Sequence, residues 1–66
     1  MTVVVNGVAR ELSDGATVAE IVLTLTTEER GVAVALNGEV VPRSEWATTA
    51  LADGQQVEVL KAVQGG

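Results

Sequence analysis

Residues 2–25 read TVVVNGVARELSDGATVAEIVLTL and predict a β-hairpin followed by a helix. Asn6 and Gly7 separate two short runs of strand-forming residues, and both tolerate the positive φ angles that a tight hairpin turn requires. Thr2–Val5 and residues 8–12 are therefore expected to pair as antiparallel strands. The chain would thus begin inside a sheet.

The helix that follows has a recognisable start. Thr17 and Glu20 have the T-x-x-E spacing of a capping box, in which the two residues satisfy each other's free amides. Four apolar residues then recur at the spacing that gives a helix one apolar stripe: Val18, Ile21, Val22 and Leu25. Threonine is a weak helix former, so the helix is expected to end near Thr26 or Thr27.

The second half of the chain is expected to complete a sheet. Residues 32–36, 40–41 and 57–60 are predicted strands, and residues 44–50, which contain Trp46, are predicted to form a short helical turn. Because residues 32–36 are apolar without alternation, that strand should be interior and at least partly covered on both faces. The first and last strands should lie parallel at the centre of the sheet.

This order of elements predicts an α+β chain of the β-grasp (ubiquitin-like) type. One mixed sheet of four to five strands would pack on a single helix. Residues 1–62 would form the domain, and residues 63–66 would form a flexible tail that contains Gly65 and Gly66.

Composition excludes several classes of function. The chain has 66 residues and a net charge of −5, which argues against nucleic acid or an anionic membrane as a partner. It has no basic leader segment, and its longest apolar run of five residues is far shorter than a bilayer span, so a cytoplasmic location is expected. It contains neither Cys nor His, which removes the thiol nucleophile and the commonest general base. A carrier or binding module is therefore favoured over an independent enzyme.

Gly65 and Gly66 offer one place for chemistry. A Gly-Gly end is thin enough to enter a narrow channel in a partner enzyme, and Gly65 would be the residue that threads it. The α-carboxylate of Gly66 is unreactive at neutral pH, but adenylation by ATP would make it a good electrophile. The alternative is a flexible terminus or a remnant of cloning sequence.

The middle of the chain carries a family resemblance. Residues 35–46 read ALNGEVVPRSEW, followed by Leu51, by Asp53-Gly54 and by the final Gly65-Gly66. This pattern resembles the ThiS family of sulfur carrier proteins. The resemblance implies that Gly66 is activated by an E1-like (ThiF-like) adenylyltransferase using ATP and magnesium. It also implies that a sulfur donor enzyme helps to convert Gly66 into a thiocarboxylate, whose sulfur a ThiG-like thiazole synthase uses in thiamin biosynthesis. The carrier itself would bind no cofactor or metal and would act as a co-substrate.

Three other functions remain open on the sequence. A MoaD-like small subunit of molybdopterin synthase would share the tail chemistry but serve another acceptor. A ubiquitin-like modifier would join Gly66 to a lysine of a target protein. A plain interaction domain would carry the Gly-Gly pair incidentally.

Strand alternation also predicts a docking surface near the tail. If Val57 and Val59 face the helix, Leu60 must face the other way, and Val4 should do the same on the first strand. We expect Leu60 and Val4 to contact partner proteins, with Arg43 as a further contact or a partner in a salt bridge. The alternative is that Leu60 curls over the sheet edge and is covered by Trp46 or by the final loop. Trp46 itself is expected to fill the core.

Overall fold

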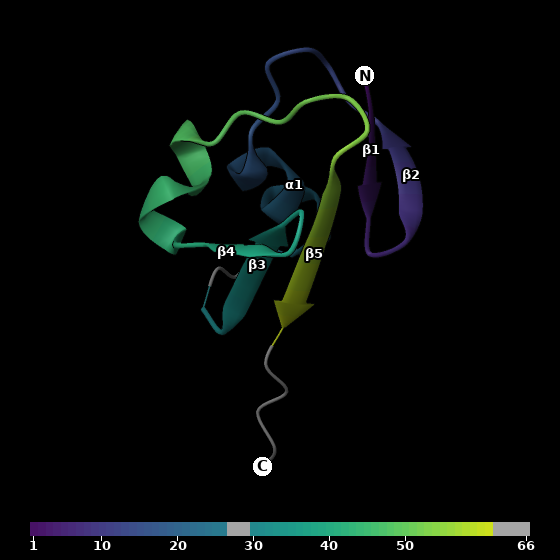
Figure 1. Ribbon diagram of the computed structural model, residues 1–66. Helices are drawn as coiled ribbons and strands as arrows, with labels where there is room; N and C mark the ends of the chain where they lie inside the picture. The colour runs from purple at the N-terminus through teal and green to yellow at the C-terminus, as the bar shows by residue number, and fades with distance from the viewer. Residues whose placement is uncertain (27–29, 62–66) are drawn as a thin grey trace.

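The computed structural model describes residues 1–26 and 30–61, which form one mixed sheet and two short helices (Figure 1). The strands are β1 (Thr2–Val5), β2 (Val8–Glu11), β3 (Val32–Leu36), β4 (Glu39–Val41) and β5 (Gln56–Lys61). The helices are α1 (Val18–Leu25) and the 3₁₀ helix η1 (Arg43–Thr48). The strand order is β2-β1-β5-β3-β4, with β1 and β5 parallel and the other neighbours antiparallel. The predicted mixed sheet and the parallel pairing of the first and last strands are confirmed.

Two Asn-Gly turns close the two hairpins. Asn6 and Asn37 both have φ 49°, and Gly7 and Gly38 have φ 81° and 86°. Two consecutive residues in the left-handed region are what a type I′ turn needs, and this turn matches the twist of the flanking strands. The register follows directly, since Val5 pairs with Val8 and Leu36 pairs with Glu39.

Helix α1 begins with the predicted capping box. The Thr17 amide donates to Glu20 Oε2 at 2.7 Å, which satisfies an amide that has no partner within the helix. Val18, Ile21 and Val22 are buried as expected. Leu25 is the exception among the predicted stripe: it is the last residue of α1, Thr26 is already extended, and the Leu25 side chain is 38% exposed.

The core lies between α1 and one face of the sheet. Valine supplies most of its volume because β-branched side chains pack well on a pleated surface. Trp46 from η1 and Leu51 join this layer from the connection between β4 and β5. The remaining members of the cluster come from β1, α1, β3 and β5: Val3, Val5, Val18, Ile21, Val22, Val34 and Val57.

Strand β3 is interior, as predicted, because it lies between β5 and β4. The expectation that both of its faces are at least partly covered is confirmed, because Ala35, on the face opposite Val34, is half-buried. Val34 is buried against the core, whereas Ala33 is exposed on the opposite face. The run lacks alternation because alanine counts as apolar in the sequence while adding too little apolar surface to require burial.

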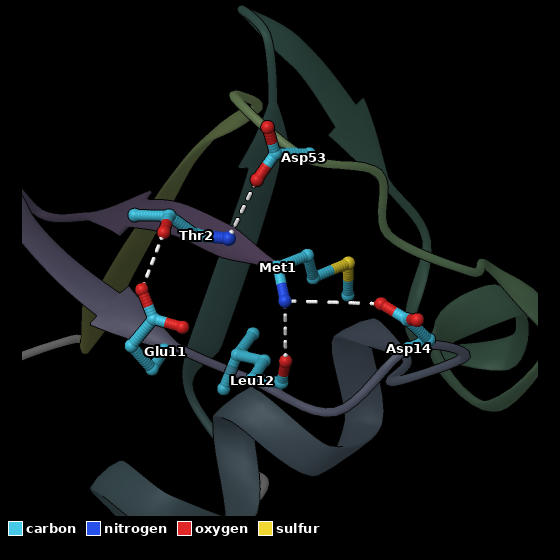
Figure 2. Close-up of polar contacts among 6 residues, drawn as sticks. All are labelled: Met1, Thr2, Glu11, Leu12, Asp14 and Asp53. Carbon is cyan, nitrogen blue, oxygen red and sulfur yellow. Dashed lines mark hydrogen bonds and ion pairs between the residues drawn. The ribbon is translucent and has the colours of Figure 1, made fainter.

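Polar contacts join the start of β1 to the loop that precedes β5, to strand β2 and to Leu12, which follows β2. Figure 2 shows the Thr2 amide donating to Asp53 Oδ1 at 2.7 Å and the Thr2 hydroxyl donating to Glu11 Oε1 at 2.6 Å. The α-amino group of Met1 donates to the Leu12 carbonyl oxygen at 2.9 Å in the same view. These contacts hold one end of the parallel β1–β5 pair in place.

Candidate functional site

The sheet face turned away from α1 carries exposed apolar side chains. Leu60 in β5 pairs with Ala33 in β3, and Val40 in β4 pairs with Ala35, so these side chains share one face. Leu60 is 65% exposed and Val40 is 77% exposed. We refer to this surface as the open-face patch, made up of Val4, Ala33, Ala35, Val40 and Leu60. An exposed apolar patch of this kind is typical of a protein–protein interface.

A shallow open groove of about 590 Å³ runs along the seam between β1 and β5 on this face. Val4 and Leu60 supply apolar walls, and Glu58 adds a carboxylate. The groove is lined by residues of both strands and of the first turn: Val4, Asn6, Gly7, Gln56, Val57, Glu58 and Leu60. An extended or apolar element of a partner protein could therefore lie along the last strand.

The structure brings together two of the three predicted docking residues. Val4 and Leu60 line the same groove, and Leu60 is not covered by Trp46, which is 3% exposed and belongs to the core on the α1 side. Arg43 lies apart from them. It begins η1, two positions after the end of the edge strand β4, and does not line the groove.

The predicted reactive residues follow the last strand. Lys61 ends β5, and its Nζ donates to Thr26 Oγ1 at 3.3 Å, which links the end of the strand to the end of α1. Gly65, Gly66 and the predicted 63–66 tail lie outside the described residues. Gly66 is five positions after Lys61, and an extended chain of that length spans at most about 17 Å. Any enzyme that acts on Gly66 must therefore hold the domain close to the end of β5.

Sequence reasoning missed a second role of the two turn asparagines. The Asn-Gly pattern at residues 6–7 and 37–38 predicts two turns and nothing more, yet the Asn6 and Asn37 side chains also form hydrogen bonds with the backbone of β5. The sequence signal for these contacts is the position of each asparagine. Each one directly follows a strand, β1 or β3, that is a neighbour of β5 in the sheet.

The side-chain chemistry of the domain is limited. The sequence contains no His and no Cys. Within residues 1–26 and 30–61, no group of three or more acidic residues is placed to hold a metal ion. Neither helix in that part of the chain has the length and apolar character needed to cross a membrane.

The fold places the protein in a general class. A mixed sheet with a parallel central pair, packed by one face on a helix that follows an N-terminal hairpin, defines a ubiquitin-like β-grasp domain. The crystal structure of a thiamine biosynthesis protein (ThiS) from Geobacter metallireducens has the same fold. It superimposes with a TM-score of 0.81 at 33% identity, covering 100% of both chains. The solution structure of a thiamine biosynthesis protein from the same organism superimposes on this chain with a TM-score of 0.80. The match covers 100% of this chain and 88% of that one.

The sequence comparisons identify the family. The ThiS family model matches residues 3–66, and this chain belongs to the ThiS family. It is 33% identical to the sulfur carrier protein ThiS of Escherichia coli over 66 residues, which is 100% of both chains. It is also 38% identical to part of the thiazole synthase of Paramagnetospirillum magneticum, and it spans 20% of that protein's length.

Proposed function

We propose that this chain is a cytoplasmic sulfur carrier of thiamin biosynthesis and that Gly66 carries the sulfur. The Gly66 carboxylate attacks the α-phosphate of ATP on an E1-like adenylyltransferase, which releases pyrophosphate and leaves an acyl-adenylate. Sulfur at the oxidation level of sulfide, delivered by a donor enzyme, then displaces AMP and forms the thiocarboxylate. The carrier is a co-substrate in these steps, because its partners supply ATP, magnesium and the acid–base groups.

The observation that carries this proposal is the match to the ThiS family over residues 3–66, which includes the Gly65-Gly66 pair. The alignment with the Escherichia coli sulfur carrier supports it over the full length of both chains. A MoaD-like carrier remains the nearest alternative in mechanism, and the same family match favours the thiamin carrier over it.

A thiazole synthase is the proposed sulfur acceptor. The support is the Paramagnetospirillum thiazole synthase, of which one fifth resembles the whole of this chain. A carrier-like segment in a polypeptide of that name suggests that the two activities work together. In the present protein we propose that thiazole synthase is a separate partner that receives the loaded carrier.

The open-face patch is the proposed docking surface for both partners. Leu60 is one residue before Lys61, and a partner must hold the domain within about 17 Å of Gly66. Leu60 and Val4 provide apolar contacts there. Arg43 lies just beyond the edge strand β4, so we propose that it contacts only a partner that reaches from the groove across β3 and β4. The net charge of −5 would steer the domain toward a basic rim, with an association rate that falls as salt rises.

The test is the product formed at Gly66. The protein is incubated with its cognate adenylyltransferase, ATP, magnesium and a sulfur source, and its intact mass is measured. A gain equal to replacing one oxygen by one sulfur supports the carrier function. A heavier covalent conjugate would indicate a protein modifier instead, and an unchanged mass in the presence of active partners would contradict the proposal. The chain without Gly66 is the control.

A further inference from the structure

The last strand loses its partner on one side before it ends. Strand β1 pairs with β5 only as far as Val57, because the chain then turns into β2. Strand β3 pairs with β5 as far as Lys61. The final part of β5, which leads toward Gly66, therefore has a complete neighbouring strand on one side alone.

The Asn6 side chain supplies the missing partner. Its Oδ1 accepts a hydrogen bond from the Val59 amide at 2.8 Å, and its Nδ2 donates to the Val59 carbonyl oxygen at 3.2 Å. The Asn6 backbone amide also donates to the Val57 carbonyl oxygen at 2.9 Å. A primary amide has the same donor and acceptor pair as a peptide group, so this side chain extends the β1 ladder by one step after the backbone has turned away.

Asn37 forms the corresponding contact at the other end of β5. Its Oδ1 accepts from the Gln56 amide at 2.9 Å, and its backbone amide donates to the Gln56 carbonyl oxygen at 2.8 Å. The two asparagines have the same φ of 49° and are each followed by a glycine with positive φ. They differ in where they hold the strand: Asn37 holds its start, and Asn6 holds the part from which the tail continues.

We propose that Asn6 is a positioning residue for the reaction at Gly66. This inference rests on the proposed function. By holding Val59, Asn6 fixes the direction in which β5 ends and hence where the following residues enter a partner that is docked on the domain. A displacement of about 1 Å at a reacting group is enough to slow a reaction severely, so a loosened strand end should reduce turnover more than docking.

Two matched variants separate positioning from general stability. Asn6→Gly and Asn37→Gly each remove one side-chain amide, and glycine tolerates the positive φ at both sites. Because these contacts are exposed to water, both variants should fold, with melting temperatures lowered by a similar amount of about 5 °C. Amide hydrogen exchange on the full chain should quicken roughly tenfold at Val59 in the first variant and at Gln56 in the second.

The kinetic readout is ATP–pyrophosphate exchange by the cognate adenylyltransferase as a function of carrier concentration. We expect Asn6→Gly to lower kcat about tenfold with little change in KM, and Asn37→Gly to leave both parameters near those of the original protein. Asn6→Asp retains the acceptor for the Val59 amide but places a second acceptor oxygen against the Val59 carbonyl oxygen, so it should recover part of the exchange protection and a corresponding part of kcat.

Three results would overturn the inference. Equal losses of kcat in the two glycine variants would indicate a general effect of stability. A rise in KM at constant kcat for Asn6→Gly would make Asn6 a docking contact, since it lines the groove. If Asn6→Asp regained slow amide exchange at Val59 without regaining kcat, the ordering of the end of β5 would not be what controls turnover. Failure of the proposed function is distinguishable, because the original protein would then show no exchange activity or would end in a covalent conjugate in place of the thiocarboxylate.

Discussion

The Trp46 indole nitrogen donates a hydrogen bond to the carbonyl oxygen of Val41 at 2.9 Å. Val41 is the last residue of β4, and Trp46 lies in η1 with its ring buried against α1 and the sheet. One side chain therefore fills the core and also fixes the position at which the chain leaves the edge strand. This finding confirms the expected packing role of Trp46.

The first prediction concerns the stability supplied by this contact. Trp46→Phe should lower the free energy of unfolding by about 2 kcal/mol, because the ring is smaller and the Val41 carbonyl loses its donor. Trp46→Ala should lower the free energy of unfolding by about 3–5 kcal/mol, which is a large share of the total stability of a domain this small. Urea unfolding should be followed by circular dichroism, since Trp46 is the only aromatic residue and its fluorescence is lost. An unchanged midpoint for Trp46→Phe would contradict this account.

The second prediction concerns deletion of Gly66. Gly66 follows the last described strand residue by five positions, so its removal should leave the melting temperature unchanged. ATP–pyrophosphate exchange with the adenylyltransferase should disappear, because the carboxylate to be activated is displaced by one residue. Normal exchange by the shortened chain would exclude Gly66 as the activated residue.

The third prediction concerns the width of the tail. Gly65→Val places a β-branched side chain next to the reactive residue and restricts the backbone, so a narrow channel should reject it. We expect sulfur transfer to fall on the order of 100-fold while thermal stability is unchanged, with Gly65→Ala giving a smaller loss.

Gln64→Val is the matched control for this prediction, because it adds the same side chain one position earlier. It should retain most of the transfer activity. Equal activity of Gly65→Val and the original protein would show that the second glycine is incidental.

The fourth prediction tests the open-face patch. Leu60→Asp should keep the domain folded, since Leu60 is 65% exposed, but should weaken binding to the adenylyltransferase and to thiazole synthase. Burying a new carboxylate in an apolar interface should cost about 2 kcal/mol, or roughly 30-fold in Kd. Titration calorimetry with each partner measures the change.

Leu23→Asp provides the control for Leu60→Asp. Leu23 has a similar exposure of 61%, but it lies on α1, on the other side of the sheet. Its variant should bind both partners normally. If the two variants lose affinity equally, or if Leu60→Asp unfolds the domain, the docking surface lies elsewhere.

Several features of this protein follow from the sequence alone because they depend on residues close together in the chain. The Asn6-Gly7 turn needs only two adjacent residues that tolerate positive φ. The Thr17–Glu20 capping box needs a spacing of three. The Gly65-Gly66 pair and the segment 35–46 likewise indicated the family, which the comparisons confirmed.

Other features depend on contacts between residues far apart in the chain, and they become visible only once the chain is folded. The Asn6 side chain holds Val59, which is 53 positions away, and no local pattern encodes that pairing. The exposure of Leu60 depends on which sheet face α1 covers, and the separation of Arg43 from the groove depends on the strand order. Local propensities specify turns, caps and strands, but the register and order of the sheet come from burying one common apolar face, which involves the whole chain at once.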